Sequence, residues 1–355
     1  MRIAIDNQST LGRKTGIGLY TINLLKAMRK VAPQHEYITL NLKRSTELRT
    51  DQRLRWQQIQ LPQLARAARA DLLHIPGFDA PKFKPFPVVL TVHDLIGMLF
   101  PQNLPPIARF YWSKWLPKSI RWADRILADS EQTRRDIVRL LSVPVDQITV
   151  IPLGVSPQFH PIQDTASLQT LRNTYQLPDK FVLFLGTLEP RKGIDTLIRS
   201  YSLIADEVSQ DLVIAGKKGW YTESLFDLVQ HRKVKDRVHF IGYVTDDKLP
   251  ALMSAADAFA FPSRYEGFGL PPLEAMACGT PVISTNISSL PEVIGDAGLL
   301  IPPDDINALA QALGEVLSTG TLRDRLTALG IARVQRFTWD TTARKTVAVY
   351  EEMAP

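Results

Sequence analysis

Short hydrophobic runs alternate with stretches of helical periodicity along most of the chain, which is the pattern of a parallel sheet covered by helices. In the first half, these runs predict strands at Ile3–Asp6, Tyr37–Leu40, Leu72–Ile75, Val88–Val92, Arg125–Ala128 and Thr149–Ile151. In the second half, they predict strands at Phe181–Leu185, Leu212–Ala215, Val238–Ile241, Ala258–Phe261, Pro281–Ser284 and Leu299–Ile301. The predicted fold class is therefore α/β.

A segment rich in proline and glycine separates the two series of strands. It contains Pro152, Gly154, Pro157, Pro161 and Pro178, and these residue types at this density interrupt both helices and strands. A chain of 355 residues also exceeds the usual size of one domain. We predict two Rossmann-like domains that face a central cleft, one at 1–160 and one at 161–336. Ligands in such folds bind beyond the carboxyl ends of the strands, so functional residues are expected in the loops that follow them.

The charge of the chain is unevenly distributed. Residues 1–180 contain 25 Lys and Arg against 14 Asp and Glu, whereas the remaining residues contain 17 against 22, so the halves carry +11 and −5. A basic half suggests an anionic partner, such as phosphate groups or an anionic membrane surface. Nucleic acid is the weakest candidate because no DNA- or RNA-binding signature accompanies the charge, and we expect none.

Several features of the sequence favour a cytoplasmic location. The chain begins directly with a strand pattern, without the apolar stretch of a signal peptide. No apolar run approaches the length that would span a bilayer. The single cysteine, Cys278, excludes an intramolecular disulfide and fits a reducing compartment. We expect a cytoplasmic protein, with peripheral attachment to the inner face of the membrane as an option.

The strongest group of candidate functional residues follows the predicted strand Ala258–Phe261. Here the chain reads Glu266-Gly267-Phe268-Gly269-Leu270-Pro271-Pro272-Leu273-Glu274. The glycines let the backbone approach a ligand closely, and the helix that the two prolines begin presents N–H groups to an anion. The two carboxylates only accept hydrogen bonds, which suits them to sugar hydroxyls. The alternative is that Glu274 complements the helix dipole and Glu266 is a solvated loop charge.

A second candidate motif, Gly186-Thr187-Leu188-Glu189-Pro190-Arg191-Lys192-Gly193, follows the predicted strand Phe181–Leu185. Lys192 is a compact cation that can neutralise a diphosphate, and Arg191 can add a bidentate contact. The alternative is a solvated basic turn.

Two candidate positions lie in the first half. His93 follows the strand Val88–Val92, and a histidine there can hydrogen-bond a sugar hydroxyl or share a proton; a loop histidine satisfied by Asp94 is the alternative. Gly16 and Gly18 follow the first strand but lack the third glycine of a dinucleotide fingerprint. A plain strand-to-helix turn explains them about as well as a binding loop.

Aromatic and basic residues interleave between Ile107 and Trp122. This mixture is typical of segments that lie on a membrane surface, but it also fits a helix whose aromatic side chains cover the sheet. The sequence has no Asp-x-Asp motif and no His or Cys cluster with metal-ligand spacing. We therefore expect neither a metal nor another cofactor.

The motifs at Ser263–Pro271 and Glu274–Val282 resemble the signature of the retaining glycosyltransferases of family 4, which have the GT-B fold, and the resemblance extends over nearly the whole chain. It implies that Glu266 contacts the donor sugar, Glu274 the nucleotide ribose, and Lys192 with the backbone of Gly267–Leu270 the diphosphate. It places His93 near the reacting centre, and it brings the loop with Gly16 and Gly18 towards the diphosphate and the acceptor. The final helix, within residues 337–355, is expected to cross back to the first domain.

One position departs from the family pattern. Many relatives have arginine where this chain has Thr187, next to Gly186, so one expected cation is missing. Either Arg191 compensates for it or the diphosphate is held differently.

The function that this resemblance implies is transfer of a hexose from a nucleotide-sugar to a glycan or lipid-linked acceptor, with retention and without a metal. GDP-mannose is the first choice of donor, with UDP-glucose or a UDP-hexosamine as the alternative. A nucleotide-sugar epimerase would act without an acceptor and is a more distant alternative. A non-catalytic sugar- or membrane-binding protein is another, and the intact glutamate pair argues against it.

Overall fold

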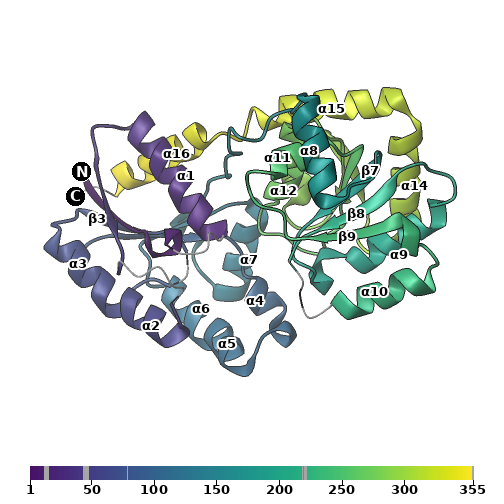
Figure 1. The fold of residues 1–355 in the computed structure, drawn as a ribbon. Helices are drawn as coiled ribbons and strands as arrows, with labels where there is room; N and C mark the ends of the chain where they lie inside the picture. The colour runs from purple at the N-terminus through teal and green to yellow at the C-terminus, as the bar shows by residue number, and fades with distance from the viewer. Residues whose placement is uncertain (12–15, 43–47, 78, 218, 220–221, 354–355) are drawn as a thin grey trace. The chain divides into compact units, whose positions relative to one another are not determined.

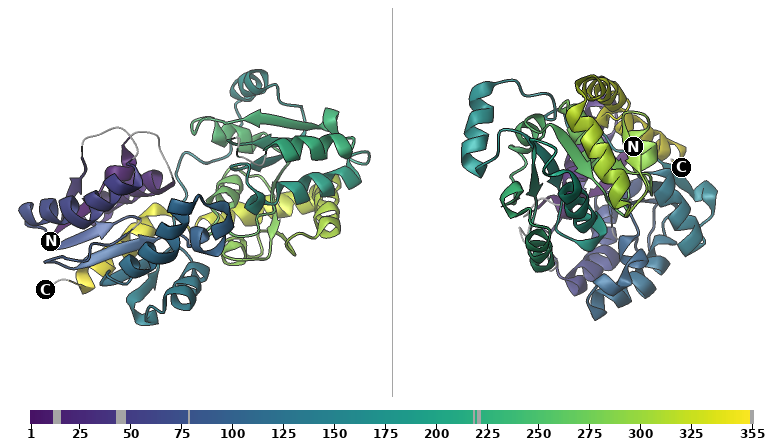
Figure 2. Two further views of the ribbon diagram at one scale, coloured as in Figure 1. Left: turned by 90° about the horizontal axis from the view of Figure 1, so that it is seen from below. Right: turned by 90° about the vertical axis from the view of Figure 1, so that its right-hand side faces the viewer.

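A computed structural model describes residues 1–11, 16–42, 48–77, 79–217, 219 and 222–353 of the chain. The chain divides into two units, residues 1–154 with 337–355 and residues 155–336. Each unit is built on one six-stranded sheet of parallel strands with helices on both of its faces (Figure 1; Figure 2). The predicted α/β class is confirmed.

The sheet of the first unit has the strand order β2-β1-β3-β4-β5-β6. Its strands are β1 (Arg2–Asp6), β2 (Glu36–Leu40), β3 (Leu72–Ile75), β4 (Val88–Val92), β5 (Arg125–Ala128) and β6 (Ile148–Val150). All side chains of β3 and β4 are buried, as expected for central parallel strands covered on both faces. The strand order reverses between β1 and β3, which makes the carboxyl ends of these strands the expected ligand-binding edge.

The helices of the first unit include two π-helical turns inside longer helical segments. Its helical elements are η1 (Gln8–Thr10), α1 (Gly16–Val31), α2 (Thr50–Arg55), the π-turn η2 (Trp56–Gln60), α3 (Leu61–Ala67), α4 (Ile96–Leu99), η3 (Pro101–Asn103), α5 (Pro106–Phe110), the π-turn η4 (Tyr111–Trp115), α6 (Leu116–Ile120), α7 (Glu131–Leu141), η5 (Val145–Gln147) and α16 (Trp339–Glu352). Proline begins α5, where a missing N–H costs nothing, whereas the prolines of α3 and α6 follow the two π-turns inside their helical segments.

The last helix, α16, belongs to the first unit and lies alongside α1 (Figure 1). The Tyr350 hydroxyl is 2.6 Å from Nδ1 of His74 on β3, and the Thr342 hydroxyl donates to the carbonyl of Pro152. At Gly154 a side chain would come within 2.3 Å of the backbone nitrogen of Trp339, so glycine is needed there for the close approach of α16.

The sheet of the second unit has the order β12-β11-β10-β7-β8-β9. Its strands are β7 (Phe181–Leu185), β8 (Asp211–Ala215), β9 (Val238–Gly242), β10 (Ala258–Phe261), β11 (Val282–Thr285) and β12 (Gly298–Ile301). The first strand of this series, β7, pairs with β8 on one side and with the fourth strand, β10, on the other. This is the dinucleotide-binding strand order, whose topological switch point lies between β7 and β10.

The helical elements of the second unit are α8 (Thr165–Tyr175), η6 (Pro190–Lys192), α9 (Ile194–Ile204), α10 (Thr222–His231), η7 (Lys235–Arg237), α11 (Leu249–Ser254), α12 (Leu270–Ala277), α13 (Leu290–Ile294), α14 (Ile306–Ser318) and α15 (Gly320–Val334). Cys278 at the end of α12 is buried. In the part of the chain that the structure describes, no helix combines the length and the apolar character that a membrane span requires.

Candidate functional site

The two loops at the switch point of the second sheet contain most of the candidate residues. The loop after β7 leads into η6 with Arg191 and Lys192, and the loop after β10 leads through Glu266 into α12. Because β7 and β10 are neighbouring parallel strands, their carboxyl ends bring the two loops together although the loops are far apart in sequence. The two motifs predicted from the sequence therefore form one cluster.

Glu266 is the centre of this cluster. Its Oε1 accepts hydrogen bonds from Nζ of Lys192 at 2.6 Å and from Nη1 of Arg191 at 3.2 Å. The Lys192 ammonium also lies 5.0 Å from the ring centroid of Phe261, the last residue of β10. The side chains of Glu266 and Lys192 are each only 11% exposed, so this is a nearly buried triad of one anion and two cations.

The charges of the triad stabilise one another against burial. Burial alone would raise the pKa of Glu266, but the neighbouring Lys192 and Arg191 outweigh it and lower that pKa below its usual value. Burial lowers the pKa of Lys192, and the Glu266 carboxylate opposes this effect. Glu266 is therefore an ionised acceptor, and a ligand diphosphate would meet cations that already have a protein partner.

Arg191 is held mainly by protein groups. Its Nη1 donates to the carbonyl of Tyr265 at 2.9 Å, and its Nη2 lies 3.4 Å from Glu189. The Nε atom of Arg191 is buried and has no hydrogen-bond partner among the described residues. This free N–H is the part of Arg191 that remains for a ligand.

Arg264 fixes the shape of the basic turn, a role that the sequence did not reveal. Its backbone N–H donates to the carbonyl of Arg191 at 2.8 Å, and its guanidinium bonds to the carbonyl of Pro190. The same guanidinium pairs with Asp195 at 3.0 Å and with Asp304 at 2.8 Å. The local sequence around Arg264 gives no signal of this structural role, because the partners of Arg264 come from three other segments of the chain.

The start of α12 offers fewer N–H groups than the sequence motif suggests. Gly269 caps the helix with a φ of +106°, a conformation that favours glycine. Pro271 and Pro272 occupy the next turn and have no N–H. Of the first three residues of the helix, Leu270–Pro272, only Leu270 therefore has an N–H that can face an anion.

Two serines after β11 hold this backbone in place. The Ser289 hydroxyl lies within hydrogen-bonding distance of the carbonyls of Glu266 and Phe268, at 2.9 and 2.7 Å, and the Ser288 hydroxyl accepts from the N–H of Glu266 at 3.0 Å. Serine is too common in loops for the sequence to have marked either position.

Glu274 lies in the second turn of α12. Burial raises the pKa of its carboxyl to about 8, and the negative charge of Asp246 adds to this effect. Unlike Glu266, this carboxyl carries a proton for much of the time near neutral pH, and it can then donate as well as accept a hydrogen bond.

Gly186 and Thr187 connect β7 to η6. The N–H of Gly186 donates to the carbonyl of Ala215 at 3.0 Å, and a side chain on Gly216 would come within 1.8 Å of the carbonyl oxygen of Gly186. Thr187 is exposed and contributes no charge, so the cations of this turn are Arg191 and Lys192.

His93 follows β4 in the first unit. Its Nδ1 is 2.6 Å from Oδ2 of Asp129, its Nε2 is 2.8 Å from the carbonyl oxygen of Pro76, and the ring of Tyr20 contacts it edge-on. The alternative partner, Asp94, instead accepts from the N–H of Ile96. Asp129 follows β5, and the sequence did not single it out.

The two glycines of the first motif have different surroundings. A side chain on Gly18 would come within 2.3 Å of the carbonyl oxygen of Ser9, so α1 packs against η1 only if this residue is glycine. A side chain on Gly16 would meet nothing within 4 Å. Packing therefore explains Gly18, whereas it gives no reason for Gly16.

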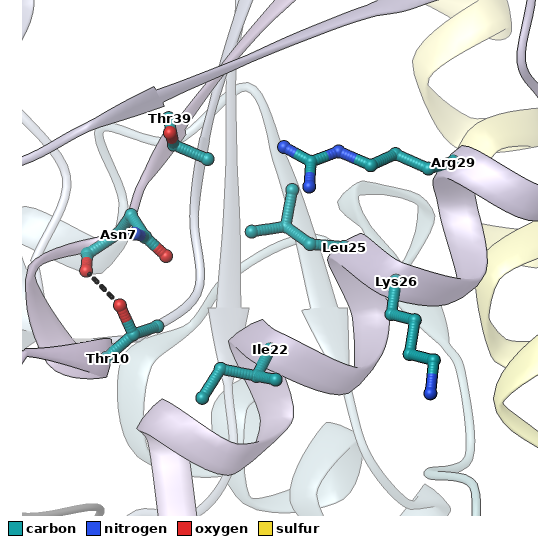
Figure 3. Close-up of a pocket in the computed structure, with 7 residues that line it drawn as sticks. All are labelled: Asn7, Thr10, Ile22, Leu25, Lys26, Arg29 and Thr39. Atoms are coloured by element: carbon teal, nitrogen blue, oxygen red, sulfur yellow. Dashed lines mark hydrogen bonds between the residues drawn. The ribbon is translucent and has the colours of Figure 1, made fainter.

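A cavity of about 580 Å³ lies in the first unit, between α1 and the β1–β2 edge of the sheet (Figure 3). It is lined by Asn7, Thr10, Ile22, Leu25, Lys26, Arg29 and Thr39. The Arg29 guanidinium points towards Thr39 and Leu25, whereas Lys26 points away from them (Figure 3). None of the residues predicted to bind a ligand lines this cavity. Among the described residues, no three His, Cys, Asp or Glu side chains form a group that could hold a metal; metal independence stays a prediction.

Both halves of the chain match known protein families. Residues 15–159 match the family described as Glycosyltransferase Family 4, and residues 170–332 match Glycosyl transferases group 1. The O-antigen chain mannosyltransferase B of Escherichia coli is 36% identical over 283 residues, which are 79% of this chain and 74% of that protein. The serotype-specific mannosyltransferase WbdA of Escherichia coli is 34% identical over 267 residues, 73% of this chain but 32% of WbdA.

Solved structures resemble the chain over almost its whole length. Sucrose-phosphate synthase from Thermosynechococcus elongatus has a TM-score of 0.76 and 24% identity, with 99% of this chain and 98% of that chain covered. HepE from Anabaena, in complex with UDP and glucose, has a TM-score of 0.75 and 19% identity, with 99% and 100% covered. At these identities the likeness concerns the fold.

Proposed function

Since this chain belongs to glycosyltransferase family 4 and has the GT-B fold, we propose that it transfers mannose from GDP-mannose to a glycan or lipid-linked acceptor. The observation that supports a donor site is the triad of Glu266, Lys192 and Arg191 at the switch point of the second sheet. The support for mannose is that relatives at 36 and 34% identity are named mannosyltransferases.

The donor is assigned to the second unit. Lys192 and the backbone of Gly267–Leu270 bind the diphosphate, where their positive charge and N–H dipoles stabilise the charge that develops on the leaving group. Glu266 accepts hydrogen bonds from the hydroxyls of the sugar, and Glu274 binds the ribose. The N–H of Gly186 is already bonded to the carbonyl of Ala215, so the hydroxyl of Thr187 next to it is the group of this turn that is assigned to the diphosphate, with the Nε–H of Arg191 as a further donor.

The reaction proceeds with retention and without a metal in this proposal. Lys192 and Arg191 supply the positive charge that a divalent ion supplies elsewhere. No protein nucleophile is assigned, and the leaving diphosphate takes part in deprotonating the acceptor, as the family resemblance implies. His93, Gly16 and Gly18 of the first unit are assigned to the acceptor and the reacting centre.

The proposed enzyme is cytoplasmic and meets its acceptor at the inner face of a membrane. One surface of the first unit supports this proposal. Helical segments 48–70 and 104–122 together contain nine Lys or Arg and one acidic residue, Asp51. The Asp79 carboxylate joins the two segments, because it accepts from Gln58 of the first and from Tyr111 and Trp115 of the second. The basic face defined by these segments also exposes Ile59, Leu64, Ile107 and Phe110, the mixture that favours an anionic lipid surface.

The experiment that tests the donor is a thermal-shift series with GDP, UDP and ADP in the presence of EDTA. GDP is expected to stabilise the protein by about 2.7 kcal/mol at one hundred times its dissociation constant. Lys192→Met should abolish this stabilisation. Lys180→Met, a change of an exposed lysine at the opposite end of β7, should preserve it.

The outcomes separate the alternatives. Stabilisation by UDP alone would replace GDP-mannose by UDP-glucose or a UDP-hexosamine, and transfer assays with these donors would then identify the sugar. A shift that disappears in EDTA would contradict metal independence. If no nucleotide stabilises the protein, the proposed donor site is wrong.

A further inference from the structure

Both ring nitrogens of His93 face oxygen atoms of the protein. Nε2 lies 2.8 Å from the carbonyl oxygen of Pro76, and Nδ1 lies 2.6 Å from the carboxylate of Asp129. A carbonyl oxygen can only accept a hydrogen bond, so Nε2 must carry a hydrogen. An ionised carboxylate also only accepts, so Nδ1 must carry a second hydrogen. With an ionised Asp129, the geometry thus fits a doubly protonated imidazolium.

The other way to satisfy these contacts would place the shared proton on Asp129 and leave both groups neutral. An imidazole nitrogen is a stronger base than a carboxylate oxygen, so the shared proton belongs on the imidazole. The short Nδ1–Oδ2 distance fits a charge-assisted hydrogen bond. Asp129 is 3% exposed, which keeps water from replacing it.

We infer that His93 serves the proposed transferase as a fixed cation rather than as a proton carrier, and that Asp129 is the positioning residue that keeps its ring charged and oriented. The inference rests on the proposed function only in one respect, the identity of the ligand on which the positive charge of His93 acts. It changes the interpretation of His93 from the sequence, where a shared proton was one of the expected roles.

The groups around the ring support a permanent charge. Burial alone would lower the pKa of His93, but the Asp129 carboxylate outweighs the effect of burial. The hydrogen bond to Pro76 and the charge of Asp94 act in the same direction as Asp129, and the pKa of His93 is raised. On β3, burial lowers the pKa of His74 to about 3, so this neighbour is neutral and does not compete as a cation. The ring centroid of Tyr20 on α1 lies 4.8 Å from that of His93 in an edge-to-face arrangement. The Tyr20 hydroxyl is hydrogen-bonded to the hydroxyl of Thr91.

The position of the ring suits an electrostatic role. Thr133, at the start of α7, donates from its hydroxyl to the backbone carbonyl of His93, so this residue is anchored at its backbone and at both ring nitrogens. A ring without a free nitrogen donates no proton and removes none from an acceptor hydroxyl. It offers positive charge at the carboxyl end of β4, the edge where ligands of such sheets bind.

Nuclear magnetic resonance of the histidine rings tests the inference without any substrate. In ¹⁵N-labelled protein, the ring signals that disappear in His93→Gln identify His93. At pH 8 both of its nitrogens should carry hydrogen in the wild type. In Asp129→Asn, whose side-chain oxygen still accepts from Nδ1, burial remains and the opposing carboxylate is lost, so the ring should titrate no higher than the ordinary pKa of about 6.5. Asp71→Asn is the control, because its carboxylate accepts from the backbone of Arg2 before β3, at the opposite edge of the sheet from His93.

The rate of transfer provides the second readout. With a pKa of 6.5 or below, at most about one thirtieth of the Asp129→Asn rings would be charged at pH 8. The kcat of this variant should therefore fall by at least about 30-fold between pH 5.5 and pH 8 relative to the wild type, whereas a purely structural defect would lower kcat equally at both pH values.

Two results would overturn the inference. One is a wild-type ring that carries a single hydrogen at pH 7, which can be read even if Asp129→Asn does not fold. The other is an Asp129→Asn ring that titrates as the wild type does. Because these signals need no donor, they are independent of whether the transfer of mannose is confirmed.

Discussion

Replacing Glu266 by glutamine should separate the two tasks of this side chain. The substitution keeps the shape but leaves Lys192 and Arg191 side by side in a nearly buried place without their anion. Removing one partner of a buried ion pair commonly costs about 3–5 kcal/mol. Because the amide oxygen of glutamine still accepts a hydrogen bond, the lower figure is expected. For a unit of this size, about 3 kcal/mol corresponds to a Tm that is lower by roughly 6–12 °C.

A nucleoside diphosphate should compensate for much of this loss. Its phosphates bring negative charge to the same two cations, which in the wild type already have Glu266 as a partner. GDP should therefore raise the Tm of Glu266→Gln by more than that of the wild type, and it should bind the variant more tightly. Transfer should nevertheless fall by about 10²–10³, because the sugar loses an ionised acceptor.

Thermal shifts with and without GDP, together with initial rates, measure all three effects. The matched control is Glu189→Gln, which removes a carboxylate that is 39% exposed and lies 3.4 Å from Arg191. An exposed pair contributes about 0–1 kcal/mol, so this variant should behave almost as the wild type. If Glu266→Gln unfolds at the wild-type temperature and gains no more from GDP, the triad does not have the electrostatic role described here.

Two further predictions concern pH and membranes. The pKa of Glu274 is raised by burial to about 8 from 4.5, so this carboxyl contributes stability that is complete below about pH 4.5 and lost as the pH rises through 8. Urea unfolding at pH 5 and pH 9 should show the wild type losing stability relative to Glu274→Gln at the higher pH, and an unchanged difference would contradict this. Changing Arg109, Lys114, Lys118 and Arg121 to Gln should weaken binding to anionic vesicles, by about 1 kcal/mol per residue at low salt. The control replaces four exposed cations of α1 and α16, Lys26, Arg29, Arg344 and Lys345, and equal sedimentation of both variants would show that the basic face binds no membrane.

The strands were predictable because each is a short apolar run between turn residues. All twelve predicted strands are present in the structure, with ends that differ by at most one residue. The sequence analysis did not predict the adjacency of the two motifs, which follows from a strand order that places the loops after the first and fourth strands of the second sheet together. Glu266 and Lys192, which are 74 positions apart, accordingly lie in contact.

The partners of the candidate residues could not be predicted in the same way. Asp129, Ser289 and Arg264 act through contacts with loops from other strands, and nothing in their local sequence distinguishes them from solvated side chains. The π-turns at Trp56–Gln60 and Tyr111–Trp115 were also missed, because one extra residue in a helical turn changes the spacing of apolar residues too little to be detected in the sequence. Both turns position side chains around buried carboxylates: Trp56 donates to Asp6, and Tyr111 donates to Asp79.

The place of α16 has a consequence for the synthesis of this protein on the ribosome. The first unit emerges first, but the helix that covers α1 and bonds to His74 is encoded after the whole of residues 155–336. At roughly 5–20 residues per second, translation of these 182 residues takes on the order of 10–40 s. During this interval the face of α1 that contains Tyr20 and Lys30, which contact Trp339 and Asp340 of α16 in the finished protein, lacks its covering helix. The second unit can fold meanwhile, so the unit that begins first along the chain is completed only after the other has been synthesised.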